Sequence, residues 1–144
     1  MNQKIFEKIK TKFNNYVSQF SLTKAEEQQN IDLKYKHSYQ VCKMMKKITA
    51  DILTEEEKYI AQTIALLHDI GRFKQYEKYK TFADAKSEDH AQLGVNVIQA
   101  NNFLAEVKAN IKELILKAIK YHNNPYLPEG ESTTALLYTK LIRD

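Results

Sequence analysis

Apolar residues recur at intervals of three and four along most of this chain, and few helix-breaking residues interrupt them. Only three glycines and two prolines occur in 144 residues. No stretch alternates apolar and polar residues cleanly, as a half-buried strand would require. Residues three and four apart share one face of an α-helix, so each periodic segment is expected to bury one side. The pattern predicts an all-α fold, a compact bundle of about six to seven helices.

The predicted helices can be placed by their apolar stripes and by the residues at their ends. The stripes occupy residues 6–20, 41–48, 60–67, 91–98, 107–119 and 135–141. Thr54 and Glu57 have the spacing of a capping box before the third stripe, and Ser87 is expected to cap the fourth. Prolines and a glycine mark residues 123–133 as a loop. We expect one domain over residues 1–144, with residues 1–22 forming an N-terminal helix outside the motif-bearing core.

Composition narrows the class of protein. Hydrophobic residues make up 43% of the chain and charged residues 28%, as in globular domains. No run approaches the ~18 apolar residues of a membrane span, and the N-terminus lacks the apolar centre of a secretory signal. The single cysteine, Cys42, has no internal disulfide partner, so we expect a reducing, cytoplasmic location and a buried, apolar role for this side chain.

Positive charge is modest overall but locally concentrated. A net charge of +4 does not indicate a dedicated nucleic-acid binder, and we do not expect nucleic acid as a partner. Residues 34–47 contain five lysines and no acid, and residues 72–80 contain four basic residues and one acid. These clusters are either solvated helix faces or the surroundings of an anionic ligand.

The four histidines fall at informative places. His37 and His122 each share a helix face with apolar residues, His68 ends an apolar helix, and His90 opens the next. A lone histidine on such a face is usually a core residue with its own hydrogen-bond partner. Several that converge are harder to satisfy separately, because each buried imidazole needs a partner. Coordination of a shared cation would satisfy them together.

Asp69 gives an independent reason to expect a cation. It is predicted to lie in the last turn of an apolar helix, where the helix dipole disfavours a carboxylate by some tenths to about 1 kcal/mol. An ion pair with Arg72 would offset this cost, and a divalent ion held with His68 would offset it more fully. Gly71 is expected to let the chain turn at the helix end. Imidazole and carboxylate ligands together suit Mn, Fe, Co, Ni or Zn, as one or two ions.

The segment HDIG, residues 68–71, together with His37 about 30 residues upstream, resembles the HD-domain superfamily of metal-dependent phosphohydrolases. The resemblance runs from about His37 to Asp144. It implies that His37, His68 and Asp69 are metal ligands. It offers Asp144 as the closing ligand, the alternative being a ligand that would follow it. In some branches, residues matching His90 and His122 hold a second metal or contact the substrate phosphate.

The resemblance also implies a reaction, the hydrolysis of a phosphomonoester or phosphodiester by a metal-activated water. His68 and Asp69 would be catalytic, and the substrate would be a small phosphorylated molecule such as a nucleotide. Arg72, Lys74 and Asn123 are the expected substrate-binding residues, although Asn123 has an alternative role in capping a helix end. The aromatic residues between 73 and 82 either stack on a nucleobase or pack into the core.

Three other interpretations remain open at this point. A minority of HD-like proteins use two irons for oxidation, and the histidine set here is large enough for two ions. A second alternative is a non-catalytic module that binds a metal or ligand with an incomplete site. In the third, all these residues are polar pairs within the core and hold no metal.

Overall fold

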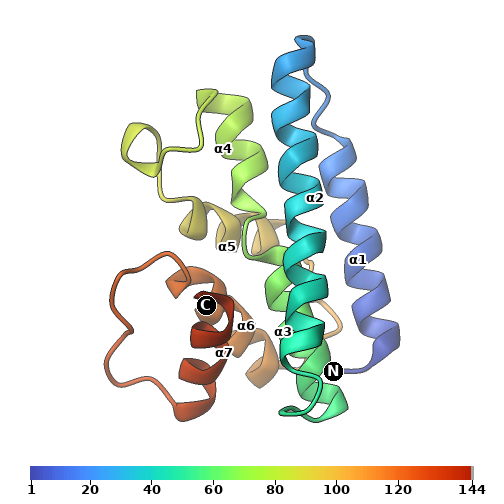
Figure 1. The fold of residues 1–144 in the computed structure, drawn as a ribbon, viewed down its shortest axis with the longest axis vertical. Coiled ribbons are helices and arrows are strands. Elements are labelled where there is room, and N and C mark those ends of the chain that lie inside the picture. The colour runs from blue at the N-terminus through green and yellow to red at the C-terminus, as the bar shows by residue number, and fades with distance from the viewer. Residues whose placement is uncertain (144) are drawn as a thin grey trace.

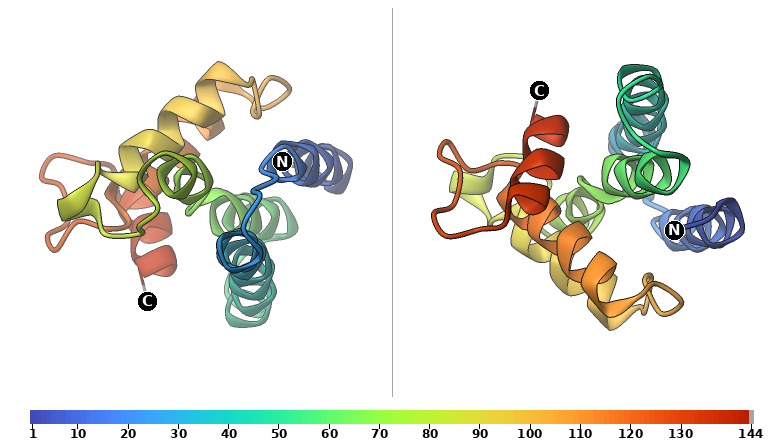
Figure 2. Two further views of the ribbon diagram at one scale, coloured as in Figure 1. Left: turned by 90° about the horizontal axis from the view of Figure 1, so that it is seen from above. Right: turned by 90° about the horizontal axis from the view of Figure 1, so that it is seen from below.

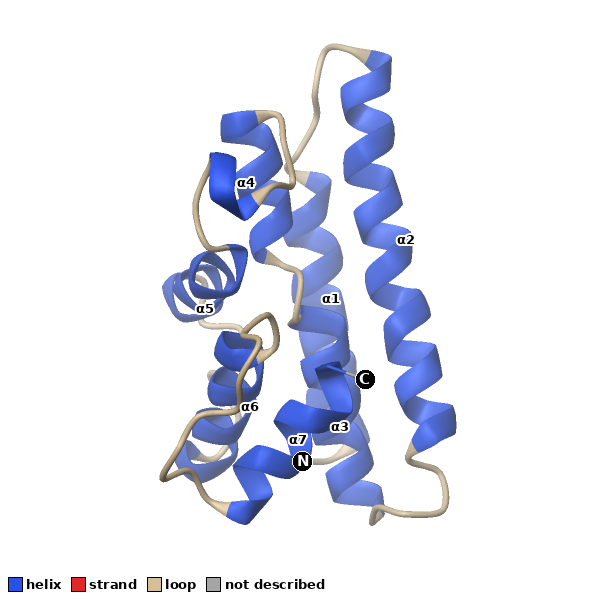
Figure 3. Cartoon of the chain, turned by 60° about the vertical axis from the view of Figure 1, so that its left-hand side comes forward, coloured by secondary structure: helices blue, strands red, loops and turns tan. Residues whose placement is uncertain are grey.

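The computed structural model describes residues 1–143, and within them it contains only helices and loops (Figures 1 and 3). The helices are α1 (Gln3–Ser18), α2 (Ala25–Ile48), α3 (Glu55–Leu67), α4 (Gly71–Tyr79), the 3-10 turn η1 (Asp84–Lys86), α5 (His90–Ala100), α6 (Ala109–Tyr121) and α7 (Thr133–Arg143). The prediction of a compact all-α bundle is confirmed. Asp144, expected to be the closing ligand, lies outside the described residues.

Helix α3 occupies the centre of the bundle and packs against α1, α2, α6 and α7. Its last eight residues, from Ile60 to Leu67, are all buried. The longest helix, α2, runs beside α1 and α3, whereas α5 and α6 lie alongside each other on the opposite side (Figures 1 and 2). Because α3 is enclosed by several helices, its C-terminal end lies in the interior of the bundle and not at the surface.

Helix α1 contributes to the same core. It buries Phe6, Ile9, Phe13 and Val17 on one face, and the ring of Phe13 lies edge-on to that of Phe73 in α4, with 6.1 Å between centroids. A helix with this spacing of apolar residues buries one stripe and leaves its lysines outside. The expected boundaries, one domain over residues 1–144 with residues 1–22 outside the motif-bearing core, stay a prediction.

Of the two predicted helix caps, the structure confirms the one at Thr54 and contradicts the one at Ser87. The capping box before α3 is confirmed, since the Thr54 hydroxyl accepts from the Glu57 backbone N–H at 3.3 Å and the Glu57 carboxylate accepts from the Thr54 N–H at 3.1 Å. The cap predicted at Ser87 is wrong, because α5 begins two residues later and Asp89 accepts from the Ala91 N–H at 3.0 Å. Ser87 instead ends the η1 turn, and its hydroxyl donates to the Ala83 carbonyl at 2.9 Å.

Several side chains whose environment was left open are buried. Phe73 and Tyr76 of α4 belong to the core, and Phe82 stacks on Tyr76 with 4.8 Å between ring centroids. The core-packing interpretation of these rings is therefore confirmed for Phe73 and Tyr76. Cys42 is buried as expected. None of the helices between residues 1 and 143 has the length and apolar character needed to span a membrane.

Candidate metal centre

The segment HDIG forms the junction between α3 and α4. Helix α3 ends at Leu67, residues 68–70 make a turn, and α4 starts at Gly71. The expectation that Gly71 lets the chain turn at a helix end is wrong, since its φ is not positive. Gly71 is needed for close packing instead. A Cβ there would overlap the carbonyl oxygen of His90 and lie 2.7 Å from the backbone nitrogen of Gly94, so α4 could not approach α5 this closely.

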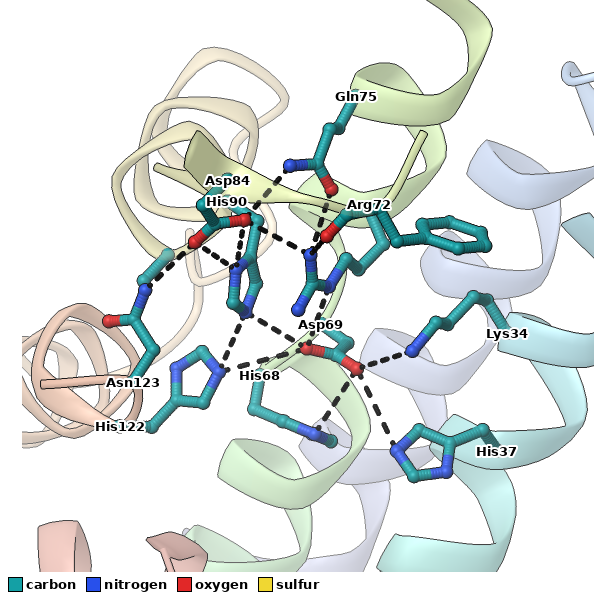
Figure 4. A network of polar contacts seen from close by, with 12 residues as sticks. Lys34, His37, His68, Asp69, Arg72, Gln75, Asp84, His90, His122 and Asn123 are labelled. Carbon is teal, nitrogen blue, oxygen red and sulfur yellow. Dashed lines mark hydrogen bonds and ion pairs between the residues drawn. The ribbon is translucent and has the colours of Figure 1, made fainter. Parts of the chain in front are cut away.

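Asp69 stands at the centre of a polar cluster drawn from five segments of the chain (Figure 4). Its side chain is buried, and both carboxylate oxygens face nitrogen atoms. Oδ1 lies 3.2 Å from Nε2 of His90 and 3.7 Å from both Nε2 of His122 and Nε of Arg72. Oδ2 lies 3.5 Å from Nζ of Lys34, 3.6 Å from Nε2 of His68 and 3.7 Å from Nε2 of His37. The fold therefore brings all four histidines around Asp69.

Three of the imidazoles have their other ring nitrogen fixed. Nδ1 of His68 donates to the Ala65 carbonyl at 2.7 Å, and Nδ1 of His122 donates to the Ile119 carbonyl at 2.6 Å. Nδ1 of His90 lies 2.8 Å from a carboxylate oxygen of Asp84. With the proton on Nδ1, a neutral imidazole presents an unprotonated Nε2. The hydrogen bonds thus direct three Nε2 lone pairs toward Asp69, as outer partners of metal-ligating histidines do.

The contact between His90 and His122 tests whether these residues fit a cation. Their Nε2 atoms are 3.1 Å apart. If both imidazoles are neutral with the proton on Nδ1, two lone pairs face each other and neither nitrogen can donate. A cation between them would satisfy both. The residues therefore fit a metal ion, and their imidazole and carboxylate donors suit Zn, Mn, Fe, Co or Ni.

The ligand atoms form two groups that share Asp69. One group consists of His37, His68 and Asp69, and the other of Asp69, His90 and His122; within each, one ligand atom from every residue lies within 4.8 Å of the others. The structure thus brings together five of the six residues expected as ligands or as second-metal residues. The sixth, Asp144, lies outside the described residues.

The electrostatic environment keeps both residues of the HD pair in the form that binds metal. Burial lowers the pKa of His68 to about 4, so its imidazole is neutral at physiological pH. Burial alone would raise the pKa of Asp69. The charge on Lys34 and the other groups that face the carboxylate outweigh burial and hold the Asp69 pKa below its ordinary value. Asp69 is therefore an anion at neutral pH.

The three expected substrate-binding residues lie in different environments. Nη1 of Arg72 donates to Gln75 Oε1, to the Phe82 carbonyl and to Asp84 at 3.0, 2.5 and 3.1 Å. Asn123 donates through Nδ2 to Asp89 at 2.7 Å and to Asp84 at 3.3 Å. Lys74 is exposed on α4, and no described contact joins it to the cluster. Within residues 1–143, Nε of Arg72 and Oδ1 of Asn123 are buried without a hydrogen-bond partner.

Sequence reasoning did not single out Lys34, Gln75 or Asp84. Lys34 was one of a run of lysines, and its position three residues before His37 on the same helix was the available signal. Gln75 is completely buried beside Arg72. Asp84 is in the loop after α4, where no helical period predicts its direction. It reaches His90 only because the loop folds back over α5.

The profile of the HD domain matches residues 35–142, which extend from α2 to α7. The chain belongs to the HD-domain family. Members of this family are generally metal-dependent phosphohydrolases. Searches of curated proteins and of solved structures gave no match. The expected HD pair, His68-Asp69, lies within the matched residues, at the α3–α4 junction where the four histidines meet.

Proposed function

We propose that this HD-domain protein is a metal-dependent phosphohydrolase that acts on a small phosphorylated molecule such as a nucleotide. The observation that carries the proposal is the convergence of four Nε2 atoms on one buried carboxylate, with three imidazoles oriented by hydrogen bonds at Nδ1. If both rings are neutral with the proton on Nδ1, polar pairing within a core would leave two imidazole lone pairs facing each other at 3.1 Å, and a shared cation would relieve this contact.

One ion would be held by His37, His68 and Asp69, and a second, if present, by Asp69, His90 and His122. A divalent ion in such a site supplies a water of lowered pKa and positive charge for the phosphoryl oxygens. We assign Asp69 chiefly to holding the metal, because it is the residue that the two ligand groups share. His68 shares that role.

The substrate would approach from the α2 side of the cluster. The side chain of His37 is 43% exposed, whereas those of His68 and His90 are 9% and 4% exposed. Lys34 lies on the same face of α2 as His37, and its ammonium is 5.1 Å from the centroid of the Phe82 ring. We propose that Lys34 neutralises phosphate charge at this entrance, since phosphoryl transfer depends on positioning and charge stabilisation.

Arg72 offers a second contact for the phosphate. Its Nη1 is engaged, but its buried Nε–H has no hydrogen-bond partner within residues 1–143 and lies 3.7 Å from Asp69 Oδ1. We propose that this N–H donates to a substrate oxygen. Asn123 Oδ1 is an unpaired acceptor that would receive a hydrogen bond from a substrate hydroxyl or a water. Lys74 would contribute only long-range positive charge from the exposed side of α4.

A second function, oxidation at a two-iron site, is favoured by one observation, which is that the two ligand groups share Asp69. The two groups together would hold two ions. Iron content near two per chain with oxygen uptake on a candidate substrate would support the oxygenase. One ion per chain with phosphate release would support the hydrolase.

The test is to remove bound metal with a chelator, reload with Mn²⁺, Fe²⁺, Co²⁺, Ni²⁺ or Zn²⁺, and measure phosphate release from phosphomonoesters, phosphodiesters and nucleotides. We expect turnover with at least one metal and its loss in Asp69→Ala. Asp51→Ala removes an exposed carboxylate outside the cluster and should be as active as wild type. Absence of turnover with every metal, or equal turnover in Asp69→Ala, would contradict the proposal.

A further inference from the structure

We propose that Asp84 is a positioning residue that keeps the single proton of the His90 imidazole on Nδ1 and so directs the unprotonated Nε2 toward the metal. The proposal rests on the proposed metal site and adds to it a residue outside the HD motif. Asp84 lies in the η1 turn, and its carboxylate contacts Nδ1 of His90 at 2.8 Å through Oδ2 and at 3.0 Å through Oδ1.

The direction of this hydrogen bond follows from the other partners of the carboxylate. Oδ1 of Asp84 accepts from Nε2 of Gln75 at 2.9 Å and from Nη1 of Arg72 at 3.1 Å. Oδ2 accepts from Nδ2 of Asn123 at 3.3 Å. Amide and guanidinium nitrogens only donate, so both oxygens of Asp84 are used as acceptors. Nδ1 of His90 must therefore donate as well, which leaves Nε2 without a proton when the ring is neutral.

Asp84 matters because a second carboxylate competes for the same proton. Nε2 of His90 lies 3.2 Å from Oδ1 of Asp69. Without Asp84, the neutral ring would gain a hydrogen bond by placing its proton on Nε2 and donating to Asp69, and Nε2 could no longer bind a metal. The shorter contact to Asp84, made by both of its oxygens, favours the opposite tautomer. The second ligand group thus depends on which of the two carboxylates accepts the hydrogen bond from the His90 ring.

The position of Asp84 is fixed although its side chain is about one-third exposed. Gln75, which is fully buried in α4, donates through Nε2 to Asp84 and also to Ser87 Oγ at 2.9 Å and to the Glu88 carbonyl at 3.2 Å. These contacts tie the loop after α4 to the helix. Figure 4 shows Asp84 between Gln75 and Arg72 on one side and Asn123 on the other. Donors from α4 and from the turn after α6 therefore hold the carboxylate over His90.

Asp84→Asn is the decisive variant, because it keeps the shape of the side chain and replaces one of its two acceptor oxygens by an NH₂ group, which donates. The amide oxygen is expected to take the position of Oδ1, where Gln75 and Arg72 donate, which places the NH₂ group at the position of Oδ2, 2.8 Å from Nδ1 of His90. The amide would then donate to Nδ1, and the ring proton would move to Nε2. Asn123 would keep its 2.7 Å hydrogen bond to Asp89 and give up the longer, 3.3 Å contact to residue 84.

Asp89→Asn is the matched control. Asp89 directly precedes His90, and an atom of its carboxylate lies within 4.8 Å of ligand atoms of Asp84 and His90. Its Oδ1 caps α5 and accepts from Asn123, and Asn is an equally good N-cap. The control removes the same charge next to His90 without changing the partner of Nδ1. It also tests the alternative that Asp84, Asp89 and His90 themselves form a metal site.

The first measurement uses metal-free, ¹⁵N-labelled protein, in which long-range ¹H–¹⁵N spectra report the protonation of each imidazole nitrogen. The chain has four histidines, so single His→Gln variants assign the signals. At a pH where the rings are neutral, we expect Nδ1–H and bare Nε2 for His90 in wild type and in Asp89→Asn, and the reverse in Asp84→Asn. Three results would overturn the proposal. The first is a proton on Nε2 instead of Nδ1 in wild type, and the second is protons on both nitrogens up to the highest pH at which the chain stays folded. The third is an unchanged tautomer in Asp84→Asn.

The second measurement is a Co²⁺ titration followed by calorimetry and visible absorption. Loss of an outer partner of a ligating histidine typically weakens metal binding by about 10–100-fold, and we expect a loss of that size in Asp84→Asn. Asp89→Asn should bind Co²⁺ within about threefold of wild type, and an equal loss in both variants would overturn the proposal. If wild type binds no Co²⁺, the proposed function fails, while the tautomer spectra still decide the role of Asp84.

Discussion

Replacing Gly71 by Ala tests the packing that forms the site. The added Cβ would overlap the carbonyl oxygen of His90 and lie 2.7 Å from the backbone nitrogen of Gly94. Both obstacles are backbone atoms of α5, so no side chain can rotate away. The second contact alone would have to lengthen from 2.7 Å to about 3.4 Å, which requires α4 and α5 to separate in a close-packed interior.

Overpacking in a core typically costs about 1–3 kcal/mol, and occasionally more when the backbone must move. We expect Gly71→Ala to lower the free energy of unfolding by roughly 3 kcal/mol or more. Because one clash is with the carbonyl of His90, the shift also displaces the start of α5. Co²⁺ affinity should therefore fall even in conditions where the variant stays folded.

Gly94→Ala is the matched control, measured with Gly71→Ala by urea unfolding at a fixed pH. A Cβ at Gly94 would have its nearest neighbours at 3.4 Å, and alanine is favoured over glycine within a helix by up to about 1 kcal/mol. We expect Gly94→Ala to remain within about 1 kcal/mol of wild type. A Gly71→Ala variant as stable as wild type would refute the proposed reason for glycine in the HDIG segment.

Three further predictions follow from buried or capping groups. Burial lowers the pKa of His68 to about 4, so below about pH 6.5 the unfolded chain binds more protons than the folded chain. Metal-free protein should therefore lose up to roughly 3 kcal/mol of its free energy of unfolding between pH 6.5 and 4. The same slope in His68→Gln would count against this assignment. Burial also raises the pKa of the Cys42 thiol to about 11. A thiol reagent at pH 8 should therefore label Cys42 on the order of 100-fold more slowly in native than in unfolded protein. Equal labelling rates would contradict the burial of this side chain. Thr54→Ala removes the α3 cap and should cost about 1 kcal/mol in urea unfolding, and no change would show that the capping box is not stabilising.

Regular spacing made much of the fold predictable. The apolar stripes predicted the helices, and the capping box at Thr54 marked the start of α3 because both of its bonds are local. The histidines of α2 and α6 lie on faces set by the same period, which is why their convergence on Asp69 could be expected. Local rules suffice where a residue's direction is fixed by its own helix.

The errors and omissions occur where tertiary packing decides. At Gly71 the sequence allowed a turn, but the reason for glycine is α5, a helix about twenty residues later in the chain. Ser87 and Asp89 are both capping residues, and only the path of the loop selects Asp89. Asp84 had no periodic signal, and its contacts come from α4 on one side and from the turn after α6 on the other. The prediction for Asp144 lies outside the described residues.

Metal content is the most direct test of the central claim, that the four histidines and Asp69 form a site for a divalent ion. The measurement is elemental analysis of protein purified without added metal, in wild type and Asp69→Ala side by side. The proposed site predicts one or two divalent transition-metal ions per chain in wild type and less than about a tenth of that in Asp69→Ala. No metal in wild type after incubation with each candidate ion, or equal metal in both proteins, would contradict the claim.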